Sequence, residues 1–271
     1  MGKYTKKKKP TKKTTKKTTK KTTKKTTKKT TIIDVPLSKH ISEGSNATLG
    51  SINYHYQKYY NTFSFIKEII LKNNNLKKLI CIPNIGSNWM QSLLMIDLNN
   101  LKSIKPVDDL IGTPLFIKEI KKCINHRLIP INFQLKIENV GTHANIIIID
   151  TKLKTIELFE PHGSRSTNSY LDSISNAYIN VSNKVKKFCK LYFPKYTYIP
   201  PYKYEPKNGL QGRLDNFSGL CVTWSILYLH YRLLNININP KILVKHIDNI
   251  MNNTKLLQYT RYIEDTLKHK I

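Results

Sequence analysis

Residues 143–160 read HANIIIIDTKLKTIELFE, and this stretch decides the fold class. The segment 143–150 is apolar on both faces, which is typical of a strand in the interior of a sheet. Residues 151–154 form a turn, and residues 155–160 return as an antiparallel strand. We therefore predict a β-hairpin in the middle of the chain.

The position of the turn predicts which side chains of the hairpin meet. A turn centred between positions 152 and 153 places His143 opposite His162. Because side chains alternate along a strand, Glu160 shares the face of His143 and lies one diagonal step away, a distance of roughly 7–8 Å that two long polar side chains can bridge. Glu157 points to the other face. Glu160 is therefore the better partner for His143, provided that the loop has an even number of residues. A loop with an odd number would exchange the faces of Glu157 and Glu160 and reverse this assignment.

Helical patterns lie on both sides of this hairpin. We predict helices over 53–72 (at least from residue 62), 114–126, 168–193, 221–234, 240–251 and 255–268, and further strands over 78–83, 131–138 and 196–200. Strands in the middle of the chain with helices before and after them predict an α+β fold, in which helices flank a central mixed or antiparallel sheet.

The charge of the chain is divided between two parts. The 271 residues carry a formal charge of +29, and residues 1–31 hold 15 lysines and no acidic residue. The remaining residues carry +14, from 31 basic and 17 acidic residues. A repeat of Thr-Lys-Lys-Thr over residues 11–31 has no apolar side chain to bury, so we expect a disordered tail over 1–31 and a folded domain over 32–271.

The lysine repeat leaves two interpretations open. Clustered lysines bind nucleic acid by releasing counterions, so the tail is a candidate phosphate-binding arm. The alternative is a solvated low-complexity segment, because no aromatic residue interrupts the repeat to stack on bases. The chain has no run of about 18 apolar residues, so we predict no membrane span. Its N-terminal region has no apolar segment, so we predict no secretory signal.

Four cysteines are scattered along the chain without a Cys-x-x-Cys pair. This pattern argues against a zinc site and a disulfide scaffold, and favours a reducing compartment. Cys81, Cys123 and Cys189 fit buried structural residues. Cys221 differs, because it follows Gly219 at a loop-to-helix junction, where unsatisfied N–H groups and the helix dipole favour the reactive thiolate. The alternative for Cys221 is again a small buried side chain.

A nucleophilic cysteine needs a base, and the base needs a group that orients it. His143 is the candidate base for Cys221, and Glu160 is the candidate orienting carboxylate. Gln211, ten residues before the cysteine, could stabilise an oxyanion together with the Cys221 backbone N–H. Asp215 competes for the loop position nearest to the site, although a carboxylate is a poor oxyanion partner. An exposed loop glutamine is the alternative interpretation of Gln211.

The order His, acid, Gln, Cys resembles the adenain/Ulp1-like cysteine proteases of clan CE, and most closely the Ulp1-like thiol proteases of large DNA viruses. The matching motifs are HAN at 143–145, ELFEPHG at 157–163 and GLCVTWS at 219–225. The resemblance covers about residues 110–240, so residues 32–109 form a divergent N-terminal part of the expected protease domain. Ala144 stands where the family usually has Trp, and Gln211 lies further from the cysteine than the usual six or seven residues.

This resemblance implies a cysteine endopeptidase in which His143, Glu160 and Cys221 are catalytic, Gln211 belongs to the oxyanion hole, and no metal or cofactor takes part. It implies substrates cut after small residues, such as Gly-Gly, in viral precursor proteins, and a location in the virion or in the host cytoplasm, at the virus factory. Two alternatives stay open. One is an isopeptidase acting on host ubiquitin or SUMO conjugates (or an acyltransferase with the same site), and the other is a non-enzymatic basic virion protein that packs DNA.

Overall fold

The computed structural model of the chain describes residues 2, 31–41, 62–85, 93–97, 104–106, 112–137, 141–163, 169–214 and 220–268. The chain divides into two units, Met1–Thr31 and Ile32–Ile271, and the elements below all belong to the second. Residues 3–30, which carry the lysine repeat, and residues 53–61 of the first predicted helix lie outside the described residues. Disorder of the tail therefore stays a prediction.

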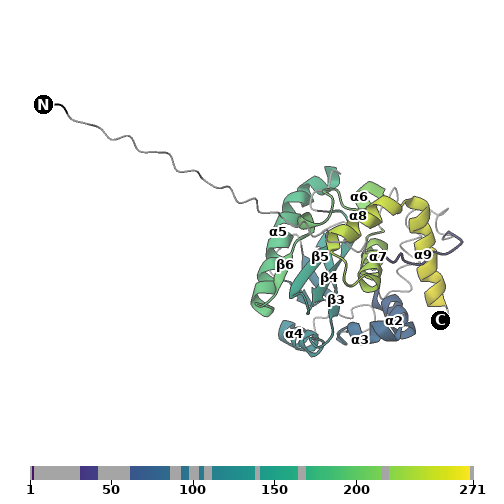
Figure 1. The fold of residues 1–271 in the computed structure, drawn as a ribbon, viewed down its shortest axis with the longest axis horizontal. Coiled ribbons are helices and arrows are strands. Elements are labelled where there is room, and N and C mark those ends of the chain that lie inside the picture. The colour runs from purple at the N-terminus through teal and green to yellow at the C-terminus, as the bar shows by residue number, and fades with distance from the viewer. Residues whose placement is uncertain are drawn as a thin grey trace. The chain divides into compact units, whose positions relative to one another are not determined.

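A six-stranded mixed sheet forms the middle of the folded unit (Figure 1), and its strands follow the order β2-β1-β3-β4-β5-β6. Its strands are β1 (Leu93–Asp97), β2 (Lys105–Pro106), β3 (Leu128–Ile137), β4 (Gly141–Asp150), β5 (Thr155–Phe159) and β6 (Thr197–Ile199). β3, β4 and β5 are antiparallel neighbours, whereas β1 runs parallel to β3 and β6 runs parallel to β5. β4 lies in the interior of the sheet, as its apolar sequence predicts.

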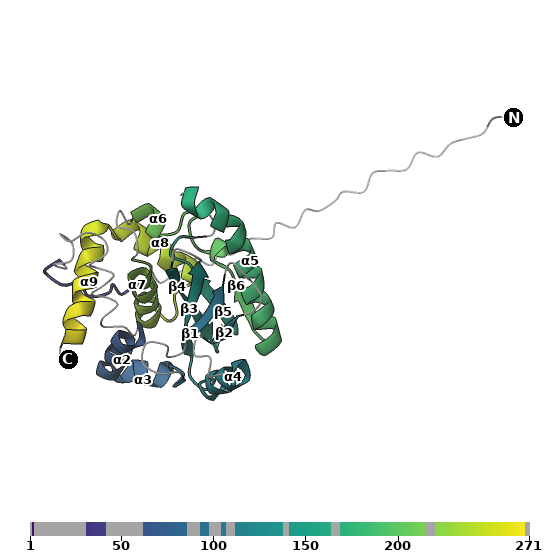
Figure 2. The same cartoon turned by 180° about the vertical axis from the view of Figure 1, so that it is seen from behind.

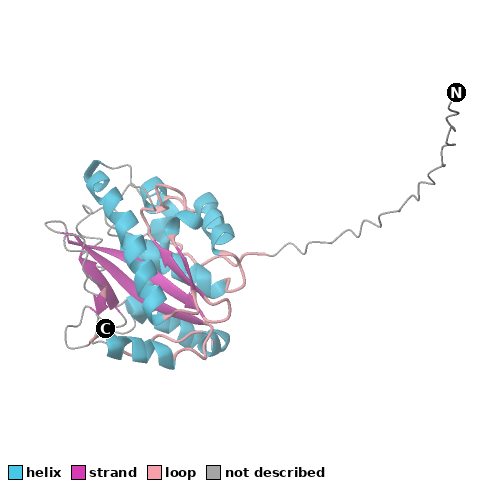
Figure 3. Cartoon of the chain, turned by 90° about the vertical axis from the view of Figure 1, so that its left-hand side faces the viewer, coloured by secondary structure: helices cyan, strands magenta, loops and turns pink. Residues whose placement is uncertain are grey.

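Helices cover both faces of the sheet. They are α2 (Thr62–Lys72), α3 (Asn74–Leu79), α4 (Thr113–Lys122), α5 (Ser169–Tyr192), the 3-10 helix η3 (Pro201–Lys203), α6 (Gln211–Leu214), α7 (Cys221–Leu234), α8 (Pro240–Ile250) and α9 (Asn253–Lys268). Figure 2 shows α4 and α5 on one side of the sheet and α7 on the other, and Figure 3 shows the long helix α5 lying across the sheet. The predicted α+β class is confirmed. No described helix combines the length and apolar composition of a membrane span.

Two apolar cores, one on each face, hold the layers together. Ile146 and Ile148 of β4 pack with α7, α2, α8 and α9. Ile147 and Ile149 pack with α4 and α5. All four side chains are buried. β4 is apolar at every position from Ile146 to Ile149 because each of its faces contacts a separate core.

The hairpin of β4 and β5 has the predicted register, in which Ile148 pairs with Glu157. Four residues, 151–154, join the strands. The Asp150 carboxylate accepts hydrogen bonds from the backbone N–H groups of Lys152 and Leu153 at 3.0 and 2.9 Å, which stabilises the turn. The loop has the even number of residues on which the placement of Glu160 depends.

The predicted strand over 78–83 is wrong. The side chain of Asn73 accepts hydrogen bonds from the N–H groups of Asn75 and Leu76, and this N-cap begins α3. Only Ile80 keeps a strand-like contact, an isolated bridge to Leu128. The apolar run was too short for its period to separate a strand from a helix.

The interpretation of Cys81 and Cys123 as independent buried residues is also wrong, because the two form a disulfide across 42 positions of the sequence. Cys189 and Cys221 are free thiols. Cys189 is a buried residue of α5, and burial raises the pKa of its thiol to about 12. A thiol with that pKa stays protonated at neutral pH, so Cys189 is a poor nucleophile. The predicted reducing compartment stays a prediction.

Candidate active site

Cys221 is the first residue of α7, a helix that is buried along almost its whole length. The first turn contains no acidic residue, and the residue before it, Leu220, provides no side-chain cap. The N–H groups at this helix end and the positive end of the dipole therefore act on the thiol without a competing side-chain anion from the helix itself. The helix begins at the residue that the sequence predicts.

The backbone of Ala144 in β4 fixes the thiol against the sheet. Its N–H group donates a hydrogen bond to Cys221 Sγ at 3.5 Å. Its carbonyl accepts a hydrogen bond from Ser225 Oγ at 3.3 Å. Cys221 and Ser225 are four residues apart and share one face of α7, so two consecutive turns of the helix contact one residue of the strand. This contact brings the thiol beside His143.

His143 and Glu160 form a short, buried pair. The Nε2 atom of the histidine lies 2.5 Å from Oε1 of the glutamate, and the two residues are 7% and 2% exposed. They lie just beyond the last pair of the β4–β5 ladder, Ile146 with Phe159, on the shared face that the hairpin register predicts. His143 and the Cys221 thiol also interact, and the charge and side-chain hydrogen bond of each shift the pKa of the other. Because Nε2 contacts Glu160, Nδ1 is the ring nitrogen that remains for the sulfur.

The electrostatics of this site favour an ion pair. Burial alone would lower the pKa of His143, but the charges of Glu160 and Cys221 outweigh it and raise that pKa to about 10. Burial would raise the pKa of the Cys221 thiol, and the charge and hydrogen bond of His143 outweigh burial, so that this pKa is lowered. Both shifts stabilise imidazolium and thiolate together. The thiolate is the nucleophilic form of cysteine.

The backbone of Gln211 contacts the turn that directly follows Glu160. Its N–H group donates to the carbonyl of Pro161 at 2.9 Å, one residue after Glu160. The Gln211 side chain is only 3% exposed, so the interpretation as an exposed loop residue is wrong. Its Oε1 atom is buried and finds no hydrogen-bond partner in the described part of the chain. Asp215, the competing candidate, falls outside the described residues.

One residue of the site, Glu205, was missed by sequence reasoning. Glu205 is buried, and its two carboxyl oxygens lie 3.2 and 3.3 Å from the backbone N–H of Glu160. Burial raises the pKa of Glu205 well above its usual range. No local pattern marks this residue, since it lies 45 positions away. For His162, the Pro-His-Gly turn directly after Glu160 already indicates from the sequence that this residue could line the mouth of the site.

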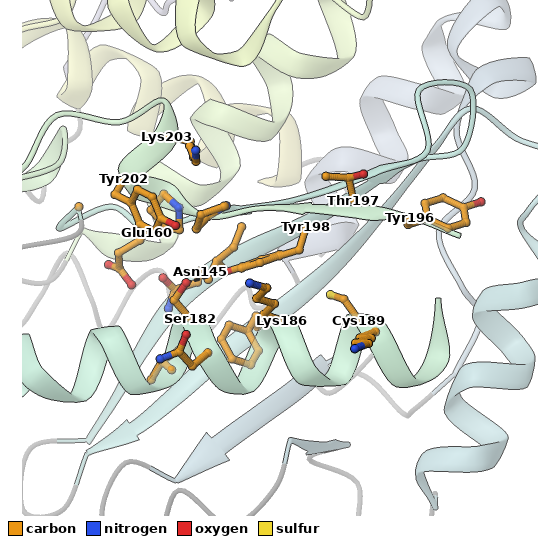
Figure 4. A pocket seen from close by; sticks show the side chains of 18 of the residues that line it. Asn145, Glu160, Ser182, Lys186, Cys189, Tyr196, Thr197, Tyr198, Tyr202 and Lys203 are labelled. Atoms are coloured by element: carbon orange, nitrogen blue, oxygen red, sulfur yellow. Dashed lines mark hydrogen bonds between the residues drawn. The ribbon is translucent and has the colours of Figure 1, made fainter. Parts of the chain in front are cut away.

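A cavity of about 740 Å³ approaches Glu160 from the α5 side of the sheet. Figure 4 shows Asn145 in the middle of β4 and Glu160 directly after β5, with Ser182 and Lys186 of α5 across the cavity from the sheet. Cys221 does not line this cavity. Among the residues that the structure describes, no group of three His, Cys, Asp or Glu side chains is placed to hold a metal ion.

Glu157 has a structural role on the other face. Its Oε1 atom lies 2.7 Å from Nε of Arg232 in α7, and both side chains are almost fully buried. Burial raises the pKa of Glu157, while the guanidinium opposes that shift. The pair ties β5 to the helix that carries Cys221.

We expect Glu157→Gln to destabilise the fold by about 3–5 kcal/mol, because it leaves the Arg232 charge buried without its carboxylate. Urea unfolding followed by circular dichroism measures the change. Asp97→Asn is the matched control, since its ion pair with Lys136 is solvent-exposed and should contribute less than about 1 kcal/mol. Equal losses in the two variants would contradict the assigned role of the buried pair.

Comparison with known proteins gives partial similarities. No family model matches the sequence. A protein of Acanthamoeba polyphaga mimivirus described as an ankyrin repeat protein is 30% identical over 128 residues, which cover 40% of this chain and 16% of that protein. The effector ChlaDUB1 of Chlamydia trachomatis covers 54% of this chain and 59% of its own at 12% identity, with a TM-score of 0.34. The Chlamydia trachomatis effector Cdu1, in a structure bound to ubiquitin, is 14% identical to this chain. The match covers 54% of this chain and 65% of that one, with a TM-score of 0.34.

Proposed function

We propose that this chain is a cysteine-type peptidase whose nucleophile is Cys221. The observation that carries the proposal is the continuous chain of contacts from Cys221 through His143 to Glu160, in which both pKa shifts favour thiolate and imidazolium. A non-enzymatic DNA-packing protein would need none of these contacts. This alternative is therefore the weaker one.

The arrangement supports acyl transfer in two steps. The Cys221 thiolate attacks the carbonyl carbon of the scissile bond, and the electron pair of that carbonyl moves to its oxygen. As the tetrahedral intermediate collapses, the His143 imidazolium gives its proton to the leaving amine, and a thioester remains on the sulfur. The neutral imidazole then takes a proton from water, whose oxygen attacks the thioester, and the thiolate returns. Glu160 holds the ring and stabilises its charged form in both steps.

We expect Gln211→Ala to lower kcat by about 10²–10³-fold, the loss typical of removing one oxyanion donor. Gln211→Glu should lower it at least as much, because a carboxylate repels the developing oxyanion. Steady-state hydrolysis of a reporter peptide measures both variants. Asn208→Ala, in the turn directly before α6, is the control. An unchanged kcat in Gln211→Ala would place the donor elsewhere, with the Asp215 loop as the next segment to test.

The proposed substrates are viral precursor proteins cut after small residues such as Gly-Gly, and the support for them is the sequence resemblance. A ubiquitin or SUMO isopeptidase would use the same three residues. Cleavage of Gly-Gly peptides with no release of ubiquitin or SUMO from lysine conjugates supports the endopeptidase, and the reverse supports the isopeptidase. Location in the virion or virus factory, and nucleic-acid binding by residues 1–31, stay predictions.

The pH dependence tests the ion pair directly. The lowered pKa of Cys221 should keep the thiolate present below the usual thiol range, so that activity falls only when acid protonates the sulfur. The raised pKa of His143, about 10, should preserve the imidazolium until strongly alkaline pH. We expect a broad bell-shaped profile of kcat/KM with its alkaline limb near that value. An acid limb close to the ordinary cysteine pKa would contradict the ion pair.

A further inference from the structure

His162 contacts both members of the buried pair, once through its backbone and once through its ring. Its N–H group donates to Glu160 Oε1 at 3.0 Å, the same oxygen that contacts His143 Nε2. Its imidazole faces that of His143, with ring centroids 4.8 Å apart and planes tilted by 34°. The backbone contact is available to any residue except proline. The ring contact depends on the side chain at position 162.

The turn that carries His162 has little freedom to move. Gly163 has φ of 73°, and its N–H group donates to the Glu160 carbonyl at 2.8 Å. A side chain at Gly163 would overlap the backbone of Gly209 and of residues 206–207, because the two segments are packed backbone to backbone. The His162 ring is therefore held over His143 by a turn that is itself fixed at both ends.

The His162 ring is uncharged when the ion pair is formed. Burial, and then the positive charge of His143, lower the pKa of His162 to about 3. A neutral aromatic ring presents its negative face to a neighbouring cation, which is favourable at this centroid distance. Among the described residues, Glu160, Cys221 and His162 are titratable groups that interact with His143. Of these, only His162 contributes an uncharged surface.

We propose that His162 is a positioning residue, whose ring covers the His143 imidazole and holds it in the orientation that serves Cys221. The residue takes no proton and touches no substrate. It acts through His143. This inference rests on the proposed function only in taking the ion pair to serve peptide hydrolysis. The ion pair itself can be measured without any substrate.

The test compares His162→Ala with His162→Phe in the full-length chain. Both variants keep the backbone N–H to Glu160, and phenylalanine also keeps a neutral ring. The rate of Cys221 alkylation by iodoacetamide is measured against pH, with Cys189→Ala as the common background. In His162→Ala the acid limb of the alkylation profile should move to higher pH, because the thiol loses its aligned imidazolium. Reporter hydrolysis should lose about 100-fold in kcat, the scale expected of a misplaced catalytic group, with KM changed far less.

His162→Phe should restore the alkylation profile and most of kcat. If the alanine variant fails to fold by circular dichroism, His162→Gln replaces it, since it fills similar space without an aromatic face. An alkylation profile in the alanine or glutamine variant equal to that of the parent would overturn the role of His162 alone. Equal losses in the phenylalanine and alanine variants would also overturn it. If Cys221 of the parent protein is alkylated only at the pH where an ordinary cysteine ionises, that result would overturn the ion pair and the proposed function with it.

Discussion

Cys221→Ala is expected to abolish peptide hydrolysis while the fold survives. The substitution removes the nucleophile, and neither His143 nor Glu160 can replace it. The rate of hydrolysis should therefore fall on the order of a million-fold. The thiol accepts a hydrogen bond from the Ala144 N–H at 3.5 Å, and its removal leaves the contact of α7 with Ala144 through Ser225 in place. Hydrolysis of a Gly-Gly reporter measures the rate, and circular dichroism checks the fold.

Cys189→Ala is the control for this variant. Its sulfur is buried and has a raised pKa, so its loss should leave the rate per folded molecule unchanged. The opposite result, with activity lost in Cys189→Ala and kept in Cys221→Ala, would mean that the wrong thiol has been assigned.

Glu160→Gln should lower kcat by about 10⁴-fold, the scale seen when the carboxylate of a triad becomes an amide. The amide can keep the contact with His143, but it no longer compensates the imidazolium charge or favours the tautomer that serves the thiol. The pKa of His143 should fall from its value of about 10, because the Glu160 charge helps to raise it. NMR titration of the His143 ring reports the pKa, and reporter hydrolysis reports kcat.

Glu119→Gln is the matched control for this change. That carboxylate contacts Lys122 at the surface of α4, so its loss should leave both the rate and the histidine pKa as they are. Glu157→Gln should also leave the rate per folded molecule close to that of the parent, although it destabilises the fold. A greater loss of rate in Glu157→Gln than in Glu160→Gln would reverse the roles of the two faces of β5.

The sequence predicted those parts of the site that depend on local geometry. The turn between β4 and β5 has four residues, and strand alternation then places Glu160 on the side of His143. The junction that begins α7 at Cys221 is equally local. The limits of α5, α8 and α9 follow from apolar periodicity and from the prolines at positions 194 and 240, and lie within one or two residues of the predicted ones.

Contacts between distant segments were beyond this reasoning. The short strands β1 and β2 exist by pairing along β3 and with each other, and their own sequences do not mark them. The disulfide of Cys81 with Cys123 joins segments 42 positions apart. Glu205 reaches the backbone of Glu160 only because a separate loop packs against the 160–163 turn.

By itself, then, the sequence determined the α+β class, the register of the central hairpin and the side chains that carry the proposed chemistry, because period, turn length and helix start are properties of neighbouring residues. Only the tertiary structure decided that the thiol meets His143, since α7 and β4 are 77 positions apart where Ala144 contacts Cys221. It also decided that the His162 ring covers His143. The protonation states of the site follow from that packing, because burial and the close approach of opposite charges set them together.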